Sequence, residues 1–399
     1  MNSFSPLRGI RILDFSKILA GPLCTQYLAD MGAEVIKVEP CETGDDTRLW
    51  PPFENGVGTI FLSVNRNKRS LAINVKSAAG LEVCRRLAAV SDVVVESFSP
   101  GVAERLGIDY ERLKAINPRL VYCSISGFGT VGPMREGKGY DVILQAFTGM
   151  LSITGEPGGG PVRSPFSPVD QATGLHAVIG ILGGLLERAR TDQGVKVEAS
   201  LFDTAVAFLA YFLQGYWQRG TEPERAGSGH ESLCPYQAFE TSDEPLIIGV
   251  ANDALWQAFC AVAGVPEIAN LPQFKTGADR VHNRAETVAT VQKVMRSRPR
   301  AEWLRLLNEA GIPCSPVHTL GELSAHPHTR ESGMVFDYLG PDGKPRKGVA
   351  PALRIDSERP GERIPPPALG EHSVDALRIA GYSAEQIESL VRDHIVRVA

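Results

Sequence analysis

An aspartate at the expected start of a helix is the strongest candidate for chemistry in this chain. Asp170 follows a segment with two prolines, residues 163–169, and precedes an apolar run over residues 175–186. We expect a helix to begin just after Asp170, where backbone N–H groups and the helix dipole favour the ionised carboxylate. That carboxylate could act as a nucleophile, with Gly174 leaving room for a ligand. The alternative is an ordinary helix cap.

A second acidic helix start precedes the first. Asp141 opens the apolar run over residues 142–150, so two helix N-termini could point into one cleft and favour an anionic ligand there. Several cations near predicted loops could contact phosphates, although each could equally be a solvated surface charge. These cations are Lys68, Arg69, Lys76, Arg105 and Lys138.

The elements that must position these residues alternate in the first third of the chain. The predicted strands are residues 10–15, 35–38, 71–75, 93–96 and 120–124, and the predicted helices are residues 23–31 and 78–90. This alternation predicts an α/β fold with a parallel sheet covered by helices on both faces. Ligands bind such sheets at the carboxyl ends of the strands, which here lead into loops at residues 16–22, 96–101 and 126–133. No dinucleotide-binding glycine pattern or P-loop is present, which disfavours a nicotinamide enzyme or a P-loop nucleotidase.

The pattern becomes mainly helical after Asp170. Residues 175–190 and 201–213 read as helices, and the polar residues 219–231 read as a linker. A smaller unit then follows, with a strand predicted at residues 246–250 and helices at residues 254–263, 285–295 and 301–310. A last helix is predicted at residues 384–392.

Bulk properties narrow the class of protein. A chain of 399 residues exceeds the usual size of a single core, which favours two domains. The net charge of −5 argues against non-specific nucleic-acid binding. Neither an apolar signal core nor a membrane span is evident, and seven scattered cysteines without a Cys-x-x-Cys pair indicate reduced thiols in a cytoplasmic protein. Without a His-x-x-x-His pattern or a Cys/His cluster, we expect no metal.

A series of motifs runs in order along most of the chain. They are LRGIRILDF (residues 7–15), AGP (20–22), LADMGAEVIKVE (28–39), NKRS (67–70), VESFSPG (95–101), GYD (139–141), Asp170 with Gly174, GIP (311–313) and LGEH (369–372). In this combination the chain resembles the family III CoA-transferases of the CaiB/BaiF type. The resemblance extends from about residue 7 to the C-terminus.

The resemblance implies a nucleophilic role for Asp170. In such enzymes the carboxylate attacks an acyl-CoA to form an aspartyl–acyl anhydride, and CoA then forms an aspartyl thioester that the acceptor acid consumes. CoA is thus part of the substrate, and no permanently bound cofactor is expected. The CoA contacts carried over by position are Leu19, Ala20, Ile73, Asn74, Val75, Lys76, Ser97, Phe98, Ser99, Arg105, Lys138, Gly139, Tyr140 and Asp141. Two positions depart from the formyl-CoA transferases, because Pro40 replaces an arginine and Ser97 replaces an asparagine.

The resemblance also implies an architecture. We expect a Rossmann-like parallel-sheet domain built from both chain ends, a smaller α+β domain, and an interlocked homodimer. The expected divisions are residues 1–218 for the CoA-binding part, 219–330 for the linker and small domain, and 331–399 for the returning segment.

Two other functions remain as alternatives. A racemase branch of the fold carries Gly-His-Asp, whereas this chain carries Tyr140 after Gly139, and a tyrosine hydroxyl is a poor base because it holds its proton until about pH 10. A non-catalytic CoA-binding protein would leave Asp170 as a cap.

The sequence constrains the acceptor acid less than it constrains the CoA site. Several segments resemble the branch that uses succinyl-CoA with dicarboxylic acids such as glutarate or itaconate: residues 44–48, 62–68, 235–239 and 280–284. The distal carboxylate of such an acid needs a cation or several donors. The candidates are Arg48, Arg163 and His230.

Overall fold

The structure is a computed structural model that describes residues 4–340, 343–360 and 364–399. Residues 1–3, at the N-terminus where no apolar signal core was evident, lie outside these ranges. The chain folds into two compact units. The first combines Met1–Thr148, Ser164–Gln214 and Pro327–Ala399, and the second combines Gly149–Arg163 and Gly215–His326.

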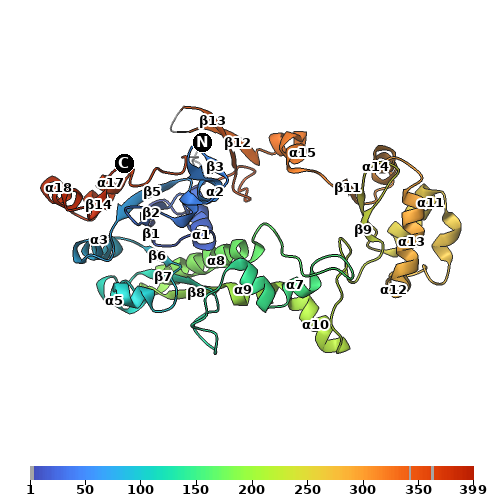
Figure 1. Ribbon diagram of the computed structural model, residues 1–399, viewed down its shortest axis with the longest axis horizontal. Coiled ribbons are helices and arrows are strands. Elements are labelled where there is room, and N and C mark those ends of the chain that lie inside the picture. The colour runs from blue at the N-terminus through green and yellow to red at the C-terminus, as the bar shows by residue number, and fades with distance from the viewer. Residues whose placement is uncertain (1–3, 341–342, 361–363) are drawn as a thin grey trace. The chain divides into compact units, whose positions relative to one another are not determined.

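A seven-stranded sheet forms the centre of the first unit (Figure 1), in the order β14-β5-β2-β1-β6-β7-β8. Its strands are β1 (Arg11–Asp14), β2 (Glu34–Glu39), β5 (Lys68–Ile73), β6 (Val93–Glu96), β7 (Val121–Ser126), β8 (Lys196–Ser200) and β14 (Val396–Arg397). Neighbouring strands are parallel except β14, which is antiparallel to β5. Continuous apolar stretches such as Val93–Val95 are fully buried, as expected for a parallel sheet covered on both faces. The predicted α/β class with a largely parallel sheet is confirmed.

The order of the strands reverses at β1. From β1 the chain adds β2 and β5 on one side, and then returns to add β6, β7 and β8 on the other. Loops that leave the carboxyl ends of strands on either side of such a point diverge and open a crevice for a ligand. The loops that follow β1 and β6 lie at this crevice, since the N–H of Phe15 donates to the carbonyl of Val95 at 2.8 Å.

Helices cover both faces of the sheet. The helices of this unit are α1 (Ala20–Asp30), α2 (Thr59–Val64), α3 (Ala78–Ala89), α4 (Val102–Leu106), α5 (Tyr110–Ile116), α6 (Asp141–Phe147), α8 (Pro168–Thr191), α9 (Leu201–Phe208), α16 (Pro327–Glu331), α17 (Ser373–Ile379) and α18 (Ala384–Arg392). A short 3-10 helix, η1 (Asp46–Leu49), and two hairpins, β3 (Phe53–Glu54) with β4 (Val57–Gly58) and β12 (Val335–Leu339) with β13 (Pro345–Val349), complete it. One core joins Val83 and Leu87 of α3 to Leu377 of α17 and Leu390 of α18, so the C-terminal helices pack with an N-terminal one.

Helix α8 is longer than the sequence pattern predicted. It packs against α1, β7 and β8 and begins at Pro168, two residues before Asp170, after Ser167 at φ 52°. The expectation that the helix starts after Asp170 is therefore wrong. With this added length, α8 is long and apolar enough to cross a membrane by length and composition alone. The shorter apolar run read from the sequence did not suggest such a helix. Core helices share these properties, and Val169, Ala177 and Ile181 of α8 are buried within the unit.

The second unit has a small antiparallel sheet in the order β11-β10-β9. Its strands are β9 (Tyr236–Phe239), β10 (Leu246–Gly249) and β11 (Cys314–Pro316). Its helices are α7 (Met150–Ile153), α11 (Asp253–Ala263), η2 (Pro266–Asn270), α12 (Gly277–His282), α13 (Arg284–Met295), α14 (Arg300–Glu309) and α15 (Leu320–Ala325), while α10 (Ala210–Arg219) begins in the first unit and ends in the second. Trp256, Phe259 and Trp303 form a fully buried apolar centre.

Candidate active site

Asp170 lies at a cavity on the ligand-binding edge of the sheet. The cavity has a volume of about 210 Å³ and is formed by the loops after β1, β6 and β7, the start of α8 and the segment before α6. Its lining residues include Lys17, Ile18, Leu19, Ala20, Ser97, Phe98, Ser99, Lys138, Gly139, Tyr140, Asp170 and Leu201. The structure thus brings Asp170 together with eight of the fourteen residues expected to contact CoA.

Asp141 directly follows Tyr140, a lining residue of this cavity, and its side chain caps the helix that carries Asp170. Its Oδ2 accepts the backbone N–H of Val169 at 2.9 Å and that of Asp170 at 3.2 Å. Gln145, one turn further along α6, donates from Nε2 to Oδ1 of Asp141 and accepts the N–H of Ser164 at 3.0 Å. Asp141 is only 5% exposed, so its carboxylate supports α8 rather than lining the cavity.

This arrangement changes the expected ionisation of Asp170. Burial, and secondly the charge of Asp141, raise the pKa of Asp170 from 3.8 to about 7. The expectation that the helix N-terminus keeps Asp170 readily ionised is therefore wrong. The N–H groups of that terminus are directed at Asp141, and the adjacent negative charge opposes ionisation of Asp170.

Gly174 allows two helices to pack closely, and it does not leave room for a ligand as the sequence had suggested. A Cβ at Gly174 would lie 2.6 Å from the carbonyl oxygen of Ala20. The missing side chain therefore allows α8 to pack directly against the start of α1. This close approach places Ala20 and Asp170 on the same cavity.

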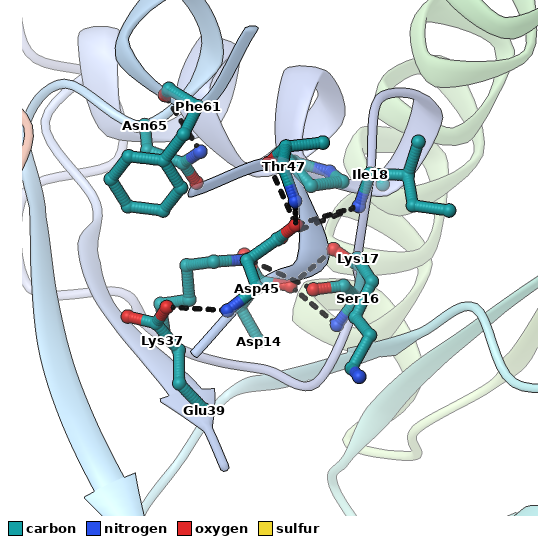
Figure 2. A network of polar contacts seen from close by, with 12 residues as sticks. Asp14, Ser16, Lys17, Ile18, Lys37, Glu39, Asp45, Thr47, Phe61 and Asn65 are labelled. Atoms are coloured by element: carbon teal, nitrogen blue, oxygen red, sulfur yellow. Dashed lines mark hydrogen bonds and ion pairs between the residues drawn. The ribbon is translucent and has the colours of Figure 1, made fainter. Parts of the chain in front are cut away.

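Buried polar groups hold the loop after β1 (Figure 2). The backbone N–H of Ser16 donates to Asp14 at 2.9 Å, and that of Ile18 donates to Asp45 at 3.3 Å. Between them, the N–H of Lys17 donates to Ser97 Oγ at 3.0 Å. Three consecutive N–H groups are thus held by side chains from three different places in the chain: the end of β1, the residue after β6, and the N-cap of η1. The loop lacks a regular element of its own and depends on these contacts for its conformation.

The charges beneath this loop form a buried network. Lys37 pairs with Asp45 at 2.9 Å, and Lys68 pairs with Asp14 at 3.3 Å, with all four side chains fully buried. Burial raises the pKa of Asp14, but the charges of Lys68 and Lys37 and hydrogen bonds from Ser16 and Thr25 together outweigh it and hold that pKa below its ordinary value. Lys68, considered above as a phosphate-binding cation, instead donates to Asp14, Asn65 and the carbonyl of Pro22.

A larger cavity adjoins the first. It has a volume of about 500 Å³ and is lined by Pro40, Ile73, Asn74, Val75 and Lys76, among others. Lys17 and Phe98 line both cavities, so the two are neighbours.

Other candidates lie elsewhere. Arg105 is on the exposed side of α4 and lines neither cavity, although Val102 and Leu106 of the same helix line the larger one. Arg48 is buried, with Nε and Nη2 donating to Glu39 at 2.7 and 2.8 Å, and Nη1 donating to the carbonyl of Pro367. Its guanidinium also lies 3.6 Å from the ring centroid of Phe61. These contacts give Arg48 a structural role in place of the expected acceptor contact.

Arg163 and His230 both belong to the second unit. His230 accepts the backbone N–H of Ser232 at 3.0 Å, and its ring lies edge-on to that of Tyr236.

Sequence reasoning missed Lys17 and Ile18 as lining residues. They lie three and four residues after β1, within the loop that the strand pattern had already placed at the ligand-binding edge. The position of the loop was the available signal, but its residue types gave no sign of a function.

Comparison with known proteins now decides the family. A model of CoA-transferase family III matches residues 7–373, nearly the whole chain. The chain belongs to CoA-transferase family III. This family III CoA-transferase is 37% identical over 398 residues to human succinyl-CoA:glutarate CoA-transferase, a match that covers 99% of the chain and 91% of the human protein.

Two further relatives bear on specificity and fold. The family III CoA-transferase described here is 37% identical over 332 residues to the acetyl-CoA:oxalate CoA-transferase of Acetobacter aceti, with 83% of the chain and 85% of that protein covered. The crystal structure of a CaiB/BaiF family protein from Brucella suis superposes with a TM-score of 0.83 at 37% identity, covering 94% of the chain and 99% of that structure. The levels of identity to the glutarate and oxalate enzymes are the same, so identity by itself does not distinguish between the two acceptors.

Proposed function

We propose that this enzyme transfers CoA from succinyl-CoA to a C4–C5 dicarboxylic acid, such as glutarate or itaconate, through covalent intermediates on Asp170. The observation that carries the proposal is the position of Asp170, on a cavity at the point where the strand order reverses, with an apolar wall and nearby lysines. The human relative named for succinyl-CoA and glutarate supports the choice of acids.

The proposed reaction begins with attack by a carboxylate oxygen of Asp170 on the thioester carbonyl carbon. The C–S bond breaks, and CoA thiolate leaves an aspartyl–succinyl anhydride. The thiolate then attacks the aspartyl carbonyl carbon, which releases succinate and forms an aspartyl-CoA thioester. The acceptor carboxylate displaces the thiolate to form a second anhydride, and attack of the thiolate on the acceptor's carbonyl gives the new acyl-CoA and restores Asp170. Each step exchanges one acyl bond for another, so no external oxidant or reductant is needed.

The ionisation of Asp170 suits this chemistry. With a pKa of about 7, the carboxylate is about half ionised near neutral pH and is more basic than an ordinary aspartate. Proximity to the bound thioester supplies most of the remaining advantage, because a carboxylate is a weak nucleophile.

We also propose a path for CoA across the two cavities. The nucleotide end would occupy the larger cavity beside Ile73, Asn74, Val75 and Lys76, and the thioester would reach Asp170 past Phe98. Lys17, Lys76 and Lys138 would pair with phosphates along this path. Ser97, another expected CoA contact, uses its hydroxyl oxygen to accept the backbone N–H of Lys17.

The homodimer remains part of the proposal. Leu175, Ile179 and Leu186 of α8 are 40, 67 and 74% exposed, an apolar surface of the kind that a second copy of the chain would cover. We likewise propose that the first unit is the CoA-binding unit, because both cavities and Asp170 belong to it.

The test is to incubate the enzyme with succinyl-CoA and trap the intermediate with hydroxylamine or borohydride. We expect a mass change on the peptide that contains Asp170, its absence in Asp170→Asn, and its persistence in Asp203→Asn, a matched first-turn aspartate of α9. Transfer is then assayed with glutarate, itaconate, mesaconate, citramalate, oxalate and carnitine. Activity confined to oxalate or carnitine would refute the proposed acceptor.

Two other outcomes identify the alternative functions. Exchange of deuterium into the acyl α-carbon without an adduct would indicate a racemase. Tight CoA binding with neither signal would indicate a binding protein.

A further inference from the structure

Ile18 has a backbone conformation that its side chain disfavours. Its φ is 72°, in the left-handed region, where branching at Cβ causes crowding. Among the described non-glycine residues with positive φ, Ile18 alone is β-branched, and the others are Asn, Asp, Ser or His. Such strain persists only where surrounding contacts fix the backbone, and it is concentrated at functional sites.

Asp45 supplies the contact that fixes this backbone. Both of its carboxylate oxygens lie 3.3 Å from the N of Ile18. The carboxylate is held in turn by Lys37 at 2.9 Å and by the backbone N–H and hydroxyl of Thr47 at 3.0 and 2.7 Å. Asp45 and Lys37 are fully buried, so this support is rigid and shielded from water.

The side chain of Ile18 points away from these polar groups (Figure 2). Ile18 lines the same cavity as Asp170, together with the apolar residues Leu19 and Leu201. A glycine would accept φ 72° without strain, but it would remove this part of the cavity wall.

We propose that Ile18 is a specificity-determining residue that selects acids with an aliphatic spacer between the carboxylates, and that Asp45 is its positioning residue. The inference rests on the proposed transfer of CoA at Asp170. Methylene groups of glutarate can pack against Ile18 as the acid approaches Asp170, whereas oxalate has none to offer. One methylene in an apolar site changes specificity by roughly 10- to 200-fold, so loss of the wall is measurable.

The experiment compares Ile18→Gly with the unaltered enzyme, using succinyl-CoA as donor and glutarate or oxalate as acceptor. We expect kcat/KM for glutarate to fall by about tenfold or more, while that for oxalate changes by less than about twofold. The urea midpoint should rise at the same time, because glycine relieves the strain. Ile18→Val, which shortens the side chain by one methylene, should give an intermediate ratio of kcat/KM for glutarate to kcat/KM for oxalate.

Asp192→Gly is the matched control. Asp192 has φ 59° at the exposed C-terminus of α8, so glycine replaces another side chain in the left-handed region without altering the cavity. This variant should leave the ratio of the two acids unchanged. Asp45→Asn should lower the ratio in the enzyme with Ile18 but lower it no further in the Ile18→Gly background.

An active Ile18→Gly enzyme whose ratio stays within twofold of the unaltered enzyme overturns the inference, as does an equal loss with both acids. If the unaltered enzyme rejects glutarate, the proposed acceptor is wrong. Ile18 is then tested on the longest and shortest acids that the enzyme does accept.

Discussion

Replacing Asp141 by asparagine should move the pH dependence of transfer toward lower pH. Asparagine keeps an oxygen that can accept the N–H groups of Val169 and Asp170, but it removes the negative charge beside the nucleophile. Reaction requires the ionised form of Asp170, so kcat/KM of the unaltered enzyme should rise with pH about a midpoint near 7.

The size of the change follows from the causes of the raised pKa. The pKa of Asp170 rises from 3.8 to about 7, a difference of about 3 pH units or roughly 4 kcal/mol. Burial is the larger cause and the charge of Asp141 the smaller. Removing that charge should therefore lower the midpoint by less than half of the difference, by about 0.5 to 1.5 pH units. Lys17, Lys138 and Tyr140 line the same cavity and are unchanged in this variant.

The assay is the initial rate at low succinyl-CoA concentration from about pH 5 to pH 9, where kcat/KM reports on the free enzyme. Asp203→Asn is the control, because the charge of Asp203 is not among the causes that raise the pKa of Asp170. A midpoint that stays in place, or moves to higher pH, in an active Asp141→Asn enzyme would falsify this account of the site.

Three further changes test other parts of the structure. Gly174→Ala should lower the free energy of unfolding, measured by urea titration, by about 1–3 kcal/mol, because the new Cβ would meet the carbonyl oxygen of Ala20. A Cβ at Gly183 on the same helix would meet nothing within 4 Å, so Gly183→Ala should be neutral or stabilising. Arg48→Ala should lower the free energy of unfolding by about 3–5 kcal/mol, because it leaves the buried carboxylate of Glu39 without its ion-pair partner. Arg69→Ala removes a half-exposed ion pair with Glu34 and should lower the free energy of unfolding by less than about 1 kcal/mol. A higher KM for the acceptor without loss of stability in Arg48→Ala would instead support acceptor binding. Asp170→Asn should raise the free energy of unfolding at pH 8 by up to about 4 kcal/mol but should change it little at pH 4. The raised pKa of Asp170 in the folded state gives the unaltered enzyme a stability that is fully present below pH 3.8 and is lost as the pH rises through 7. An equal effect at both pH values would contradict this linkage.

Local patterns in the sequence determined the main elements. The predicted strand at residues 93–96 and the predicted helix at residues 384–392 match β6 and α18 to the residue. Strands buried on both faces and amphipathic helices leave a strong periodic signal, which is why these elements could be read directly. Helix starts were less certain, since α8 begins at Pro168 with its capping carboxylate supplied by Asp141, a residue from another helix.

The tertiary structure alone decided what the charged residues do. Lys68 and Arg48 look like ordinary cations in the sequence, but each is buried against a carboxylate from a different element of the fold. The segment Gly149–Arg163 packs with the second unit through a hydrogen bond from Gly227 to the carbonyl of Gly155. Contacts of this kind join residues far apart in the chain, so no local pattern reports them.

The sequence by itself determined the α/β class, the family resemblance and the aspartate at the centre of the proposed chemistry, because these depend on residue type and order. Only the tertiary structure decided that Asp141 raises the pKa of Asp170, that Gly174 joins two helices and that Ile18 forms part of the cavity wall. Burial and the distances between charges set those properties, and both are fixed only when separate strands and helices pack together.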